Sequence, residues 1–178
     1  QISPYVNYRA FNVAPGHMDC LDVRKAIFFA WPAQALINLG GGVRFSGKLG
    51  DGLISPLVPD YAPTTGNIHD SNFKAAGNAA YAKTILATAA TSCPTTYKRV
   101  TTTGFSVDTT DSATNRKAAT IIQNAMNAIG VKVTFNYIPV GVYYPTVMNP
   151  DKQGDLSGAG WGADWANAST VRSEEHTS

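Results

Sequence analysis

A short run near the C-terminus, residues 160–165 (GWGADW), combines two tryptophans with one carboxylate. Tryptophan rings offer apolar surface and attract cations through their faces, and a carboxylate such as Asp164 provides a counter-charge for an ammonium group. The glycine and alanine residues between them let a ligand approach the backbone. The pattern fits a small-ligand site, and it fits equally well a core tryptophan followed by a capping aspartate.

Residues that usually carry catalysis or bind metals are sparse. His17 and His69 stand in separate polar loops without a second ligand at metal-binding spacing, so we interpret both as surface histidines. The chain has no nucleophile elbow, P-loop or HExxH motif, and the glycines at 40–42 lack dinucleotide-binding spacing. We therefore predict no catalytic residue, no metal ligand and no cofactor.

Composition narrows the classes of partner. The 178 residues suit one domain, and 14 Lys+Arg against 12 Asp+Glu give a net charge of only +2, with the basic residues scattered. Nucleic-acid binding needs clustered Lys and Arg, so we predict no nucleic-acid partner. No apolar run approaches the roughly 20 residues of a membrane-spanning helix, and no secretory signal precedes the first predicted strand.

The two cysteines, Cys20 and Cys93, are too far apart in sequence for a CxxC redox or zinc motif. Both lie at predicted junctions between a loop and a regular element. The residues alone do not decide between two free buried thiols and one disulfide. A disulfide would indicate an oxidising compartment.

The elements that must position these residues alternate between strand and helix. Aromatic and β-branched residues predict strands at 5–13, 97–107, 131–138 and 156–161. Apolar spacing predicts a helix capped by Asp22 and broken at Trp31-Pro32, so that 22–39 forms two short helices, and further helices at 72–90, 112–129 and 142–148. The order indicates an α/β fold with a βαβ unit over 97–138.

The last seven residues, 172–178 (RSEEHTS), match the translation of a common short-read sequencing adapter. We expect this tail to be non-native, and we expect the gene to be truncated at both ends. The chain opens with Gln1 instead of Met, which agrees with a missing N-terminal part.

Four stretches resemble the family-5 extracellular solute-binding proteins of the dipeptide- and oligopeptide-binding type. Their order and spacing carry the resemblance over about residues 5–171, although Trp31-Pro32 departs from an acidic–basic pair usual there. The stretches are YRAFNV (8–13), DVRKAIFFAWPAQALI (22–37), IIQNAMNAIGVKVTF (121–135) and GWGADW (160–165).

The resemblance implies a class II periplasmic-binding-protein-like fold. Residues 1–171 would form most of the C-terminal-side lobe of a two-lobed receptor that closes on its ligand. It also implies the substrate-binding component of an ABC importer, which works outside the cytoplasm with the transporter's membrane subunits. Any membrane attachment would be through an N-terminal anchor that this sequence does not contain.

The same resemblance assigns roles to the motif. In peptide-binding relatives its aspartate pairs with the α-ammonium of the ligand, which implies that role for Asp164, a backbone contact at Gly162, and pocket walls at Trp161 and Trp165. The family also takes nickel complexes and sugars, so the ligand class stays open. Relatives from high-GC Gram-positive bacteria are similar at both cysteines, which implies a Cys20–Cys93 disulfide.

Two other functions remain to be weighed against this one. An α/β enzyme with an unrecognised active site should show paired titratable groups in a pocket. A protein-interaction module should show a continuous exposed apolar patch. The arrangement of Trp161, Asp164 and Trp165 on one open face, or their burial in the core, would separate these readings.

The adapter interpretation makes a simple prediction for residues 172–178. Deleting them should leave the melting temperature unchanged, because a non-native tail has no evolved packing partner. Calorimetry on the protein with and without the tail measures this. A lower melting temperature after deletion would show that the tail belongs to the fold.

Overall fold

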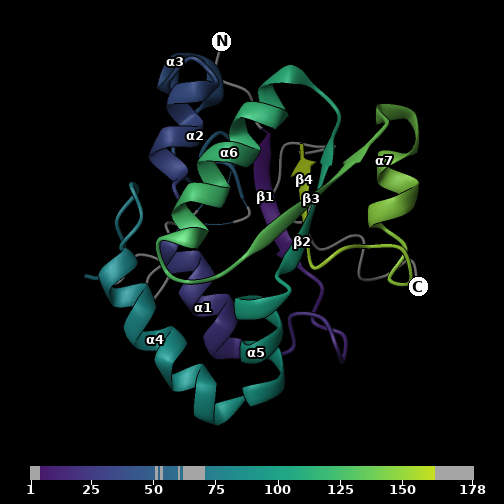
Figure 1. Cartoon of the computed structure of the whole chain (residues 1–178). Coiled ribbons are helices and arrows are strands. Elements are labelled where there is room, and N and C mark those ends of the chain that lie inside the picture. Colours follow the sequence, from purple (N-terminus) through teal and green to yellow (C-terminus); the bar gives the residue numbers. More distant parts are fainter. Residues whose placement is uncertain (1–4, 51, 53, 60, 62–70, 163–178) are drawn as a thin grey trace.

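The computed structural model describes residues 5–50, 52, 54–59, 61 and 71–162. Its centre is a sheet in the order β1-β4-β2-β3, formed by β1 (Val6–Phe11), β2 (Phe105–Thr110), β3 (Val133–Ile138) and β4 (Leu156–Trp161). β2 runs parallel to both β3 and β4, and β1 is antiparallel to β4 (Figure 1). The predicted βαβ unit is thus present as β2, a helix and β3.

Seven helices surround this sheet in the described part of the chain. Most lie on one side of the sheet, and α7 lies on the other (Figure 1). Their bounds are α1 (Leu21–Ala30), α2 (Ala33–Leu39), α3 (Val43–Ser46), α4 (Ala79–Ser92), α5 (Pro94–Thr102), α6 (Ala113–Asn127) and α7 (Val140–Val147).

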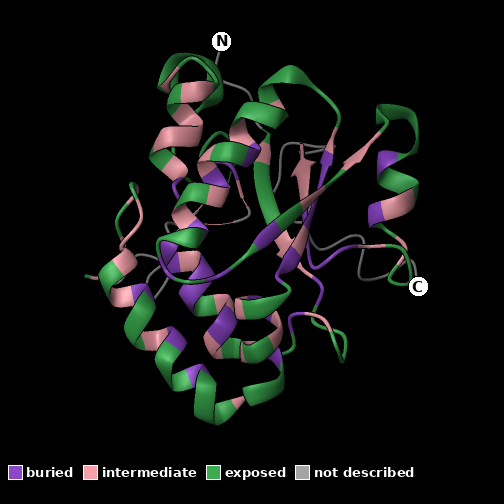
Figure 2. Cartoon of the chain, in the orientation of Figure 1, coloured by how far each residue is buried: buried purple, intermediate pink, exposed green. Residues whose placement is uncertain are grey.

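The main core lies between the sheet and the helices opposite α7. Helix α1 contributes Val23, Ala26, Ile27 and Ala30, all buried, at the spacing of one helical face. In Figure 2 the buried stretches of the helices are concentrated where the helices lie next to one another and next to the strands. The fold class predicted from the sequence, α/β, is confirmed.

Several predicted elements agree closely with the structure. The 112–129 helix is α6, and the Ser112 side chain accepts a hydrogen bond from Asn115 N at its start. The chain breaks between α1 and α2 at Trp31 and Pro32, as predicted from the missing proline N–H. Two details differ: α4 begins at Ala79 instead of near residue 72, and Cys20, not Asp22, is the N-cap of α1.

The prediction of a strand over 97–107 is wrong in its first half. Pro94 opens helix α5, and the strand β2 begins only at Phe105. The threonines that suggested a strand fit the helix because Thr101 and Thr102 donate their hydroxyls to carbonyls one turn back. Tertiary packing decides the outcome, because burial of Thr96 and Val100 at helical spacing outweighs a local strand preference.

A polar cluster ties the loop after β1 to helix α5 and the sheet. The buried Asp155 carboxylate accepts two hydrogen bonds from Arg99, at 2.9 and 3.1 Å, and one from the Ser106 backbone at 2.9 Å. His17 Nδ1 lies 3.2 Å from the same carboxylate, and its carbonyl accepts from Arg99 at 2.7 Å. His17 therefore has a structural partner and is not simply a surface histidine.

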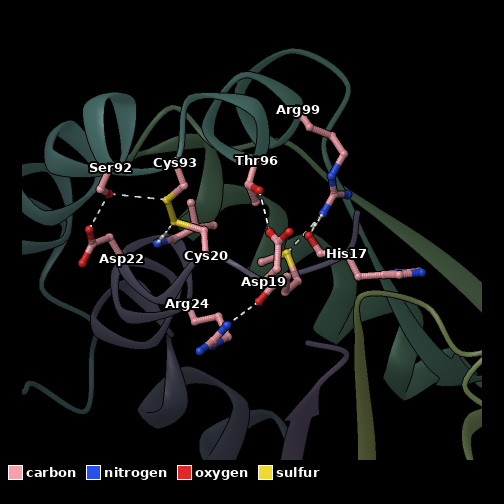
Figure 3. The surroundings of a disulfide bond; sticks show 11 residues. His17, Asp19, Cys20, Asp22, Arg24, Ser92, Cys93, Thr96 and Arg99 are labelled. Carbon is pink, nitrogen blue, oxygen red and sulfur yellow. Dashed lines mark hydrogen bonds between the residues drawn. A yellow bond between two sulfur atoms is a disulfide. The ribbon is translucent and has the colours of Figure 1, made fainter. Parts of the chain in front are cut away.

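The Cys20–Cys93 disulfide is present and joins the start of α1 to the junction of α4 and α5 (Figure 3). The two Cα atoms are 6.0 Å apart, within the range that a disulfide spans. Next to it, Thr96 Oγ1 donates to Asp19 Oδ1 at 2.7 Å, and this hydrogen bond lowers the pKa of Asp19. The disulfide implied by the family resemblance is confirmed.

Reducing the disulfide should lower the free energy of unfolding by about 4 kcal/mol, because the bond closes a long loop in the unfolded chain. The sequence separation is 73 residues. Urea unfolding with and without reductant measures the difference. The variant Cys20→Ser/Cys93→Ser is the control, since reductant should not change its midpoint. An unchanged midpoint for the wild type would contradict the prediction.

Candidate ligand site

The predicted motif begins at the end of β4. Because β2, β3 and β4 are parallel, their carboxyl ends meet at one edge of the sheet, the edge at which ligands bind in open α/β sheets. The antiparallel β1 starts at the same edge, where Val6 pairs with Trp161. Trp161 and Gly162 both lie there and are partly exposed. Asp164 and Trp165 lie outside the described residues, so their roles stay predictions.

Trp161 and Gly162 each have an unusual environment. Among the described residues, nothing accepts a hydrogen bond from the buried indole Nε1 of Trp161. A buried donor without an acceptor costs about 1–3 kcal/mol. Gly162 lies against the Tyr5 ring, and a Cβ there would come 2.7 Å from a ring carbon. Glycine at 162 therefore lets the Tyr5 ring lie directly against the backbone, and a side chain there would displace the ring.

Two side chains of β1, and that of the residue before it, lie across glycines in β4 and directly after it. Arg9 and Asn7 are the register partners of Gly158 and Gly160, and Tyr5 extends the series over Gly162. A Cβ on Gly160 would meet Asn7 Oδ1 at 2.8 Å, and one on Gly158 would collide with the Arg9 guanidinium. Tyr5, Asn7 and Arg9 are all exposed, and we call them the β1 strip.

Sequence reasoning did not identify the β1 strip as part of a site. The signal was present, because every second residue of β1 faces the same side as every second residue of β4. Using it required the pairing of two strands about 150 residues apart, which the sequence does not give.

Between β2 and β4 the sheet opens toward this edge. The two strands pair only at Val107–Leu156 and Asp108–Ser157. Beyond this point the Tyr143 hydroxyl donates to Gly158 O at 2.6 Å and accepts from Gly158 N at 3.1 Å. Burial raises the pKa of Tyr143, so the phenol stays protonated at neutral pH and can donate. Tyr143 thus satisfies backbone groups of Gly158 that β2 would have bonded if its pairing with β4 had continued beyond Asp108.

Asp108 holds the turn before β4 from within the sheet. This carboxylate is buried, and it accepts from Gly154 N at 2.6 Å, Ser157 Oγ at 2.9 Å and Asn136 Nδ2 at 2.8 Å. Both oxygens are therefore engaged by neutral donors. Asp108 connects β2, β3 and the start of β4 and is a positioning residue.

Other regions of the described chain offer less chemistry. A shallow depression beside the disulfide includes Asp19 and Thr96, and it follows the C-terminal end of β1, whereas Trp161 pairs with the first residue of that strand. Within the described ranges, no group of three His, Cys, Asp or Glu could hold a metal ion, and no helix is both long and apolar enough to cross a membrane. His69 lies outside those ranges.

Comparison with known proteins agrees with the sequence motifs. The model of bacterial extracellular solute-binding proteins, family 5 Middle, matches residues 1–174. The chain belongs to this family. No curated protein matches it in sequence.

Solved structures show the same fold. The substrate-binding protein CtaP of Listeria monocytogenes superposes with a TM-score of 0.74 at 12% identity, covering 97% of this chain and 32% of its own. The Escherichia coli murein tripeptide binding protein MppA superposes with a TM-score of 0.72 at 18% identity, and the match covers 94% of this chain and 31% of MppA. DppA from Helicobacter pylori, in complex with the peptide STSA, superposes with a TM-score of 0.66 at 21% identity, and the match covers 94% of this chain and 29% of DppA.

These comparisons confirm the predicted family and the class II periplasmic-binding-protein-like fold. The chain spans about a third of the length of the solved structures it matches. The family and these structures are solute-binding proteins and not enzymes.

The bridging role of Tyr143 predicts that Tyr143→Phe lowers the free energy of unfolding by about 1–3 kcal/mol, because Gly158 loses both partners of its backbone groups. Chemical denaturation measures the loss. Tyr144→Phe is the matched control, since Tyr144 is exposed and such changes cost less than about 0.5 kcal/mol. Equal stability of the two variants would contradict the bridging role.

Proposed function

We propose that the chain is part of the substrate-binding component of an ABC importer and captures peptides outside the cytoplasmic membrane. The observation that carries the proposal is the position of Trp161 and Gly162, the first residues of the family motif, at the carboxyl edge of the sheet. A murein tripeptide binding protein and a peptide complex of DppA among the similar structures support a peptide ligand.

In this proposal residues 1–171 form one folded unit, most of the C-terminal-side lobe, and residues 172–178 are a non-native tail. The site is completed by a second lobe, which closes over the ligand and excludes water. The transporter's membrane subunits are the protein partners. The family description as extracellular supports the location, and an N-terminal lipid anchor would hold the receptor at the membrane.

The proposed ligand contacts follow from the motif. Trp161 and Trp165 form apolar walls, Gly162 gives a backbone contact, and Asp164 pairs with the α-ammonium group of the peptide. The buried Nε1 of Trp161 supports this role, because an unpaired donor at the site can be satisfied by a ligand carbonyl. An enzyme would need paired titratable groups, whereas Asp108 and Tyr143 near this edge are engaged in holding the backbone.

The ammonium contact is tested by Asp164→Asn in the full-length receptor. This change should weaken peptide binding by about 2–5 kcal/mol, because the ligand ammonium would be buried without its counter-charge. Calorimetry with a peptide and with its N-acetylated form measures the effect. The acetylated peptide should bind the wild type as weakly as the free peptide binds the variant.

Asp151→Asn is the matched control, because Asp151 is an exposed aspartate in the turn before β4 and should not contact the ligand. Unchanged affinity for both Asp164→Asn and the acetylated peptide would rule out the ammonium contact. A sugar or a metal complex would then be the better ligand class.

A further inference from the structure

Arg9 has no carboxylate partner in the described part of the chain. The ion pairs there join Asp155 to Arg99 and His17, and Asp111 to Arg116, and no hydrogen bond is formed by the Arg9 side chain. Its guanidinium carbon lies 6.0 Å from the centre of the Trp31 ring, a cation–π contact that attracts the guanidinium without neutralising its charge. An arginine held beside a sheet without a counter-ion can bind an anion by donating hydrogen bonds to it.

The surroundings of Arg9 strengthen an interaction with an anion. The residue is exposed, so a solute can reach it, yet protein atoms around the guanidinium desolvate it and lower the pKa of Arg9. It remains charged, since an arginine cannot be deprotonated under physiological conditions. Because the guanidinium is partly desolvated, its electrostatic attraction to an incoming anion is stronger than the same attraction in open water.

The position of Arg9 is fixed by the sheet. It pairs in register with Gly158, whose missing side chain leaves room for the guanidinium. The backbone of Gly158 is in turn held by the Tyr143 hydroxyl. The planar guanidinium matches two oxygens of a carboxylate, which it can bind with two parallel hydrogen bonds.

The spacing along β4 suits a short peptide. Gly162, a member of the family motif, and Gly158 lie on the same face and are four residues apart, which at strand geometry is roughly 13 Å. An extended peptide of three to four residues covers about the same distance. The exposed Tyr5 lies at the Gly162 end, and the exposed Asn7, the register partner of Gly160, lies between the two ends.

We propose that Arg9 is a specificity-determining residue that binds a carboxylate of the ligand. The inference rests on the proposed peptide-binding function and extends it. With the ammonium group held at the motif, the carboxylate at Arg9 is either the C-terminus of a short peptide or an acidic side chain within a longer one.

The experiment uses the full-length receptor and three probes: tetra-alanine, its C-terminal amide, and the amide with glutamate at the third position. By calorimetry the wild type should bind one of the carboxylate-bearing peptides about 10- to 100-fold more tightly than the plain amide. Preference for tetra-alanine assigns the C-terminal carboxylate, and preference for the glutamate amide assigns an acidic side chain. Either result supports the inference.

Arg9→Met should remove this preference and leave the affinity for the plain amide unchanged, while Arg9→Lys should keep part of it. Arg116→Met is the matched control, because Arg116 already pairs with Asp111. This variant should prefer the carboxylate-bearing peptide as strongly as the wild type does. The inference is overturned if Arg9→Met retains the preference, or if it weakens all three peptides equally, which would indicate a structural role. Failure of the wild type to bind any of the three peptides would count against the proposed function itself.

Discussion

The buried carboxylate of Asp155 is the contact on which the arrangement of this fold depends. It lies one residue before β4 and receives hydrogen bonds from Arg99 in α5 and from the backbone N–H of Ser106 in β2, with His17 beside it. These bonds fix where β4 enters the sheet, and hence the register that brings its glycines under β1. Removing one partner of such a buried pair typically costs 3–5 kcal/mol, because the other charge is left stranded.

The geometry at the ligand edge is set by polar contacts placed deeper in the sheet. Asp108 holds the turn before β4, and Tyr143 closes the gap where β2 and β4 separate. Neither side chain needs to touch a ligand to matter. They leave the backbone near Gly158 satisfied and fixed, so that the strands can part at the edge without exposing unpaired groups to the interior.

The sequence predicted most of the elements and missed the contacts between them. The α6 helix was evident from its apolar face and Ser112 cap, whereas 97–102 was misjudged because a threonine-rich segment has similar local preferences in helix and strand. The cysteines were found at once, but their pairing came from the family resemblance and not from spacing. Arg9 could not be singled out, because the absence of a carboxylate partner among the described residues becomes visible only when β1 is laid beside β4.

Large side chains on β1 face glycines on β4, and this arrangement affects how the ligand preference of such a receptor can change during evolution. Since glycines stand at 158 and 160 in β4 and at 162 directly after it, Tyr5, Asn7 and Arg9 cover the backbone at these three positions. Changes at Tyr5, Asn7 and Arg9 alter the charge and shape of the surface there without disturbing the pairing of the backbones. The glycines can therefore stay the same while the side chains opposite them change. Single substitutions at these side chains can alter ligand preference while the fold is kept.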